Sequence, residues 1–288
     1  MTSDIANQAS ATGWTSRLWR AAPIRIIAGA LLCIAPVAFF MAATHALIDK
    51  PYRQVWPFVL SAVLCLGIYR WFAQTLEKRT AVELARNAAL REFALGSLMG
   101  LALICAVTFV LWTAGVVHFE GAGNGGWLNP LAEMLLAATL EEVVFRAVLF
   151  RILADWLGAR IALVVSALLF GLAHFSGDGF SLFAFAGVTL AGVLLTSAFL
   201  RTGRLWLPIG LHFGWNFTSV AVFGYATSGN PAQGMLRTTL AGPDWLTGGA
   251  FGVEASAVTL IAIALLSAAL LALPKKRMQP ATQQESHA

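Results

Sequence analysis

Long apolar runs separated by short polar segments make up most of this sequence. A helix needs about 20 predominantly apolar residues to cross a bilayer. Seven runs have about that length or more, and an eighth at 161–174 is shorter; together they cover residues 26–48, 52–72, 93–117, 128–156, 161–174, 180–200, 206–225 and 255–273. The pattern predicts an all-α fold, a polytopic membrane bundle of about eight transmembrane helices.

The polar segments between the runs divide the chain. Residues 74–91 alternate charged side chains with Leu and Ala, which predicts an amphipathic connector helix at the membrane surface. Residues 226–253 are rich in Gly and hold two Pro, which predicts a long extracytoplasmic loop. The predicted organisation is a polar cytoplasmic tail at 1–22, N-terminal transmembrane helices with the connector at 23–127, a core at 128–225, the loop at 226–253, and a last helix with a basic tail at 254–288.

Composition supports a membrane protein. The chain is 58% hydrophobic and only 11% charged over 288 residues, more apolar than a soluble core of this size requires. Cys33, Cys65 and Cys105 each lie inside an apolar run without metal-type spacing, so the sequence predicts neither a disulfide framework nor a Cys-ligated metal.

The positive charge of the chain fits membrane topology. The net charge is +5, but the Lys and Arg residues stand singly or in short groups at the ends of apolar runs, so we expect no nucleic-acid partner. With both termini in the cytoplasm, fifteen of the nineteen Lys and Arg residues fall on that side, and only Lys50, Arg53 and Arg237 fall on the other. We therefore expect an integral protein of a bacterial-type plasma membrane with both termini cytoplasmic.

Three charges interrupt the run at 128–156. Glu141, Glu142 and Arg146 lie where charged side chains are costly, and such residues usually mark function. On a helix, Glu142 and Arg146 share one face at i and i+4 and can neutralise each other, whereas Glu141 is turned about 100° away. We expect Glu142 and Arg146 to be structural, and Glu141 to be left without a local partner.

Three later polar residues also lie within apolar runs: His174, His212 and Asn216. His212 and Asn216 share one helical face, and each residue taken alone is typical of an interhelical hydrogen bond. A carboxylate, two imidazoles and a carboxamide together can activate water and hold the oxyanion that forms when water attacks a carbonyl. Glu141, His174 and His212 with an open water position are also a known type of zinc ligand set. The sequence leaves both chemistries open, so a divalent metal such as zinc is a candidate cofactor.

These motifs resemble those of the CAAX-protease and bacteriocin-processing (CPBP, or Abi) family of intramembrane proteases. The pattern Glu-Glu-x-x-x-Arg is matched at 141–146, Phe-x-x-x-His at Phe170 and His174, and His-x-x-x-Asn at His212 and Asn216. The resemblance covers about residues 128–225. It implies that Glu141 and His174 activate water and that His212 and Asn216 stabilise the oxyanion, with Glu142, Arg146 and Phe170 in support. Both metal-dependent and metal-free glutamate mechanisms have been proposed for this family.

The leading hypothesis is an intramembrane endopeptidase that acts on a peptide or a membrane-anchored protein. The alternatives are a proton-coupled transporter, which the same polar residues in apolar helices would suit, and a scaffold or immunity protein without proteolysis. Counted along its helix, His174 lies nearer the far side of the membrane than Glu141 and His212 do. The helix at 161–174 must therefore be tilted or continue past His174.

Overall fold

A computed structural model describes residues 21–272. The predicted N-terminal tail up to residue 20 and the basic tail from residue 273 lie outside the described residues. The fold subdivides into the following α-helices: α2 (Ala22–Leu47), α3 (Trp56–Trp71), α4 (Ala89–Thr113), α5 (Leu128–Glu142), α6 (Arg151–Leu157), α7 (Ala159–Ala173), α8 (Leu182–Thr202), α9 (Trp206–Phe217), α10 (Asp244–Thr247) and α11 (Ala257–Ala272).

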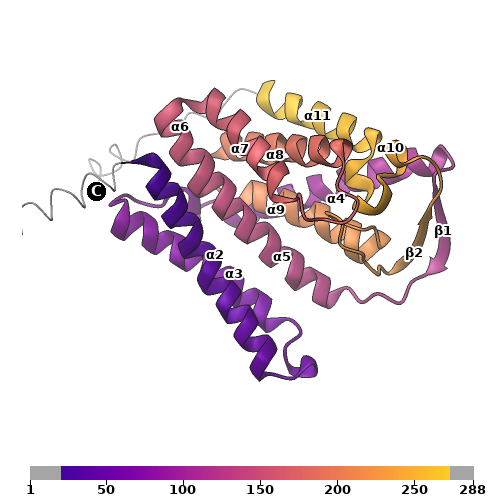
Figure 1. Cartoon of the computed structure of the whole chain (residues 1–288), viewed down its shortest axis with the longest axis horizontal. Coiled ribbons are helices and arrows are strands. Elements are labelled where there is room, and N and C mark those ends of the chain that lie inside the picture. Colours follow the sequence, from indigo (N-terminus) through magenta and orange to yellow (C-terminus); the bar gives the residue numbers. More distant parts are fainter. Residues whose placement is uncertain (1–20, 273–288) are drawn as a thin grey trace, which may run out of the picture.

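Shorter elements extend or connect these helices. Three π-helical segments continue α3, α5 and α9: η2 (Phe72–Leu76), η4 (Val143–Phe150) and η5 (Thr218–Phe223). Four 3₁₀ turns are η1 (Lys50–Tyr52), η3 (Val82–Leu84), η6 (Gly249–Phe251) and η7 (Val253–Ala255). Because η4 joins α5 to α6 without a break, the predicted long helix at 128–156 is present as one helical rod (Figure 1).

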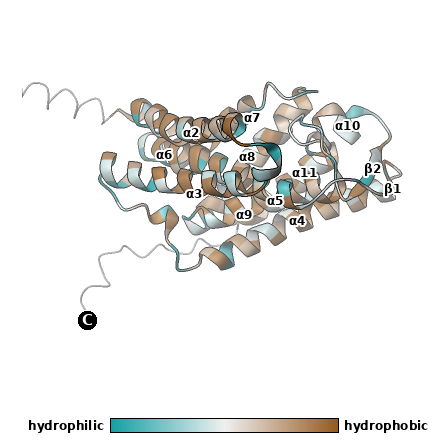
Figure 2. Cartoon of the chain, turned by 90° about the horizontal axis from the view of Figure 1, so that it is seen from below, coloured by the Kyte–Doolittle hydropathy of each residue, from teal (hydrophilic) through white to brown (hydrophobic). Residues whose placement is uncertain are grey.

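The prediction of an all-α membrane bundle is confirmed in outline. Four helical stretches in the described part of the chain are long and apolar enough to cross a membrane: Ala22–Leu47, Trp56–Leu76, Ala89–Thr113 and Leu182–Thr202. Helices α7 and α11 are apolar but shorter, so the structure supports four spans by length and does not confirm eight. Most helices are coloured brown for hydrophobic residues in Figure 2.

Two expectations about the polar segments are wrong. The connector after α3 is not an amphipathic helix, because between η2 and α4 it forms only the short turn η3 and buries Glu83. The segment 226–253 is not a plain loop, since it contains the strand β2 (Leu236–Leu240), which pairs with the antiparallel strand β1 (Val117–Ala122) at one end of the molecule (Figure 1). The connector folds inward because arginines pair with its carboxylates, an arrangement that helical periodicity does not reveal.

Glycines set the closest helix contact, between α4 and α9. A Cβ added at Gly96 or Gly100 of α4 would lie 2.3 or 2.2 Å from a carbonyl oxygen of α9. Gly210 and Gly214 of α9 are equally close to carbonyl oxygens of α4. Small residues spaced four apart let helix backbones approach closely. This contact fixes the position of α9, which carries His212 and Asn216.

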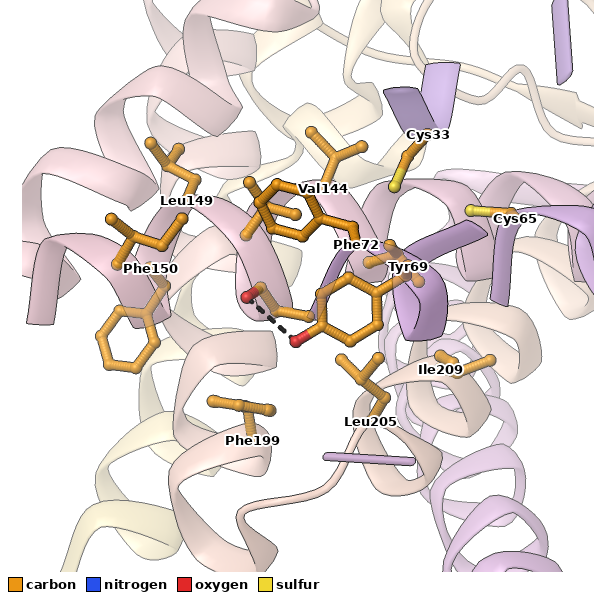
Figure 3. Packing of buried hydrophobic residues seen from close by; sticks show 14 of the residues in the cluster. Cys33, Cys65, Tyr69, Phe72, Val144, Leu149, Phe150, Phe199, Leu205 and Ile209 are labelled. Carbon is orange, nitrogen blue, oxygen red and sulfur yellow. Dashed lines mark hydrogen bonds between the residues drawn. The ribbon is translucent and has the colours of Figure 1, made fainter. Parts of the chain in front are cut away.

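The N-terminal hairpin of α2 and α3 packs against η4. Figure 3 shows Tyr69 and Phe72 beside Val144, with Cys33 and Cys65 facing each other nearby. The Tyr69 hydroxyl donates a hydrogen bond of 3.3 Å to the carbonyl oxygen of Ala147 in η4. Burial of these large side chains against η4 stabilises the position of the long helix.

Candidate active site

The Glu-Glu-x-x-x-Arg motif at 141–146 and helix α9 meet in a buried charge network. Arg146 donates a 2.9 Å hydrogen bond from Nη1 to Glu142 Oε1, as the i to i+4 spacing predicts, and both side chains are at most 1% exposed. The same Oε1 lies 2.9 Å from Nδ1 of His212. A carboxylate that is already paired with a guanidinium acts as an acceptor, so Nδ1 of His212 carries the proton. Glu142 therefore also orients His212, which the sequence did not predict.

The imidazole of His174 is oriented in a similar way, by a backbone carbonyl group. It caps the C-terminus of α7, and its Nδ1 lies 2.8 Å from the carbonyl oxygen of Phe170. A carbonyl oxygen only accepts hydrogen bonds, so Nδ1 is again the protonated nitrogen. In both histidines Nε2 is left free for another partner.

Glu141 faces both free nitrogens. Its Oε2 lies 3.9 Å from Nε2 of His174 and 3.9 Å from Nε2 of His212. These separations are too long for hydrogen bonds, and no hydrogen bond from the described residues reaches the buried Oε2. No Arg or Lys in the described part of the chain forms an ion pair with Glu141, in agreement with the interpretation of its spacing. A carboxylate and two imidazoles therefore point at one another with their lone pairs uncommitted.

Phe170 is the packing centre of this group. Its ring meets Phe145 edge to face at a centroid distance of 4.9 Å, and it lies 5.0 and 6.2 Å from the rings of His174 and His212. The Arg146 guanidinium stands over its face, with Cζ 4.5 Å from the centroid. This cation–π contact and the edge contacts hold the two imidazoles apart at a fixed spacing.

Asn216 lies one turn after His212 on α9 and is 9% exposed. Its amide makes no hydrogen bond to another described residue, and it lines two adjoining cavities. The smaller, of about 50 Å³, also contains Glu141, His174 and His212 in its wall. The larger, of about 750 Å³, opens beside Glu141 and His174 and is bordered by the turn at 176–177 and the segment 227–233.

The end of α7 decides one of the two alternatives for His174. Helix α7 does not continue past His174, because it holds 15 residues and ends at Ala173. Nε2 of His174 lies 3.9 Å from Glu141 Oε2, and Ser176 and Gly177 just after it border the larger cavity.

Sequence reasoning missed two residues of this wall. Ser228 and Glu254 come from the segment predicted as a loop and from the start of the last helical region, yet both line the smaller cavity with Glu141 and the histidines. Ser228 also borders the larger cavity. Neither stands in an apolar run, so the signal that singled out the other polar residues was absent.

The three predicted metal ligands have donor atoms of the kind zinc binds, and each histidine has a partner on its second nitrogen. Among residues 21–272, however, no three His, Cys, Asp or Glu side chains lie close enough to share one ion. A divalent metal at Glu141, His174 and His212 stays a prediction, which elemental analysis of the purified protein and of a His174→Ala variant would test directly.

Comparison with known proteins adds family evidence. A model of the family described as "Type II CAAX prenyl endopeptidase Rce1-like" matches residues 123–218, which contain all three motifs. The Bacillus subtilis (strain 168) protein named "Putative membrane peptidase YdiL" is 24% identical over 173 residues, 55% of this chain and 67% of that protein. These matches confirm the resemblance to CPBP-family proteases that the motifs indicated, and support a CAAX-type protease in general.

Proposed function

We propose that this protein, a relative of the CPBP-family proteases, is an intramembrane endopeptidase that hydrolyses a peptide bond with a water molecule activated by Glu141 and His174. The observation that carries the proposal is the convergence of Glu141 Oε2 on Nε2 of His174 and of His212, at 3.9 Å each. Glu141 Oε2 and His174 Nε2 are proton acceptors with no other partner, so they form a site for a water molecule, and His212 lies beside them to bind the carbonyl oxygen that the water attacks.

The first step is attack of water on the scissile carbonyl. Glu141 takes one proton from water while the oxygen forms a bond to the carbonyl carbon. His174 accepts a hydrogen bond from the same water through Nε2, because its Nδ1 is committed to the Phe170 carbonyl. The product of this step is a tetrahedral oxyanion.

His212 and Asn216 stabilise that oxyanion. His212 donates from Nε2 only as an imidazolium, a form that Glu142 at Nδ1 and Glu141 near Nε2 favour electrostatically. Asn216 supplies a second donor from its uncommitted amide. One such preorganised donor is worth about 3 kcal/mol of transition-state stabilisation.

Collapse of the intermediate completes the reaction. The bond between carbon and nitrogen breaks, and Glu141 returns its proton to the leaving nitrogen. Overall, one peptide bond and one water are consumed, and the new carboxyl group passes its proton to the new amine, so a carboxylate and an ammonium group are released. The larger cavity, of about 750 Å³, has the size of a typical ligand pocket and leads a peptide segment to this point.

The substrate class is a membrane-associated peptide or protein, as the family comparison suggests. The positive-inside distribution of charge supports cytoplasmic termini, which stay a prediction.

Cleavage of a peptide library by the purified protein in detergent tests the proposal. Wild-type protein should cut a subset of peptides, detected by mass spectrometry. Glu120→Gln is the matched control, because Glu120 lies on exposed β1 at the end of the molecule, and it should cut the same subset. If folded wild-type protein cuts no peptide and no membrane-anchored substrate, the assignment as a peptidase is wrong.

A further inference from the structure

A second carboxylate, Glu254, lines the small cavity together with Glu141. It belongs to η7, just before α11, and shares the cavity wall with Glu141, His174 and His212. None of the steps derived above uses it. Its position depends on Gly187 of α8, where an added Cβ would lie only 2.6 Å from the Glu254 carbonyl oxygen.

A tight turn presents Ser228 to this carboxylate. Thr227 and Asn230 exchange backbone hydrogen bonds of 3.0 and 2.9 Å, and the two residues between them, Ser228 and Gly229, have φ values of +51° and +77°. Positive φ at both central positions is typical of a type I′ hairpin turn. The two hydrogen bonds between Thr227 and Asn230 do not use the N–H groups of Ser228 and Gly229. The Gly229 N–H donates instead to the Phe251 carbonyl oxygen at 3.0 Å.

Ser228 occupies only one oxygen of Glu254. The Ser228 N–H and its hydroxyl, the latter at 2.9 Å, both donate to Oε1. No hydrogen bond from the described residues reaches Oε2, and no Lys or Arg among them forms an ion pair with this side chain. Oε2 is therefore the oxygen available to a molecule in the cavity.

The electrostatics of Glu254 favour a positively charged or N–H-donating ligand. Burial raises the pKa of the Glu254 carboxyl, and the hydrogen bonds from Ser228 offset this only in part. The titratable groups that share its cavity are Glu141 from α5, His174 from the end of α7 and His212 from α9. A desolvated carboxylate that lacks a cation gains most when a ligand provides one.

We propose that Glu254, oriented by Ser228, binds the amine side of the scissile bond: its Oε2 accepts a hydrogen bond from the nitrogen that leaves, and then pairs with the ammonium group of the released fragment. This role rests on the proposed peptidase function. It makes Glu254 a substrate-binding residue, distinct from the groups that activate water and hold the oxyanion.

A binding experiment tests the proposal without turnover. The probes are a hydrophobic tripeptide with a free N-terminal amine and the same tripeptide N-acetylated, because most of the cavity wall is apolar. Wild-type protein should bind the free amine about tenfold or more tightly, the effect of one charge-assisted hydrogen bond. Glu254→Gln should lose this preference, and Ser228→Ala should reduce it. A preference that is absent in wild type, or unchanged in Glu254→Gln, overturns the proposal.

A kinetic experiment separates this role from a structural one. For a peptide that wild-type protein cleaves, Glu254→Gln should lower kcat/KM about tenfold or more, whereas the matching ester, which has no N–H to donate, should be affected far less. Equal losses on amide and ester would indicate a structural role and contradict the proposal. Glu120→Gln again serves as the carboxylate control, with both rates unchanged. Absence of any cleavage by wild type would instead count against the peptidase, and the tripeptide binding would still decide the role of Glu254.

Discussion

Two buried clusters of charge in this protein have opposite balances of cations and anions. In the arginine cluster, Glu77 accepts from Arg25, Arg79 and Arg151, and Glu83 pairs with two of these same arginines. Among the described residues, Glu141 and Glu254 line the small cavity and Glu142 contacts its lining residue His212, but the only guanidinium paired with any of these three carboxylates is Arg146, with Glu142.

The difference distinguishes carboxylates that stabilise the fold from carboxylates that are available for binding or proton transfer. Each carboxylate of the arginine cluster has at least two cationic partners, so the cluster is neutralised from within and ties the connector after α3 to α6. At the cavity Glu141 and Glu254 each keep an oxygen without a partner among the described residues. Uncompensated carboxylates next to imidazoles are suited to accept protons or to bind amines.

The largest effect is expected from Arg146→Ala. It would leave Glu142 buried without its cation, which costs about 3–5 kcal/mol of unfolding free energy. Thermal unfolding in detergent and expression level measure this. The double variant Glu142→Gln with Arg146→Gln should recover part of the stability but not the cleavage, since His212 loses its carboxylate. A stable, inactive Arg146→Ala protein would instead place Arg146 in the chemistry.

Asn216→Ala should reduce kcat about 100- to 1,000-fold, the cost of one oxyanion donor. Because the donor acts in the transition state, kcat and kcat/KM should fall together while KM changes little. Steady-state kinetics on one cleaved peptide measures both. A rise in KM alone would make Asn216 a substrate-binding residue.

Gly100→Ala should destabilise the protein by about 1–3 kcal/mol, because the new methyl group would lie 2.2 Å from the Leu211 carbonyl oxygen and push α9 away from α4. Gly67→Ala in α3 is the matched control, since its Cβ meets nothing within 4 Å. Unfolding temperature and cleavage rate should both fall only for Gly100→Ala. Equal results for the two variants would show that this helix contact does not position His212 and Asn216.

The smallest effect is expected in the arginine cluster. Arg151→Ala removes contacts of 2.5 Å to Glu77 and 3.5 Å to Glu83, but both carboxylates keep Arg79. We expect a loss of about 1–2 kcal/mol in unfolding free energy, and an unchanged turnover rate per folded molecule. A lower turnover rate per folded molecule would contradict the purely structural role of the arginine cluster.

The sequence was informative where the physics is local. The ion pair of Glu142 and Arg146, the shared face of His212 and Asn216, and the isolation of Glu141 all follow from helical spacing, and the structure shows each of them. Polar residues inside apolar runs stand out because burying them without partners is costly. Their catalytic roles stay predictions.

Contacts between distant segments were not predictable in this way. Glu254 lies in a Gly-rich polar stretch where a glutamate is ordinary, and only the turn at Thr227–Asn230 and the close approach at Gly187 bring it to the cavity. The inward fold of the connector likewise depends on Arg25 and Arg151, which are far from it in sequence. Periodicity describes which face of a helix is apolar, but not which distant charge will neutralise a given carboxylate.

The most direct test of the account is the cleavage rate of Glu141→Gln. This substitution keeps the shape of the side chain and removes the proton acceptor that faces both histidines, so the protein should fold like wild type, with an unchanged unfolding temperature, and cleave peptides only at the background rate. Glu120→Gln, assayed beside it, should cleave at the wild-type rate. Measurable peptide cleavage by properly folded Glu141→Gln protein would contradict the assignment of Glu141 as the general base and, with it, the mechanism proposed for this site.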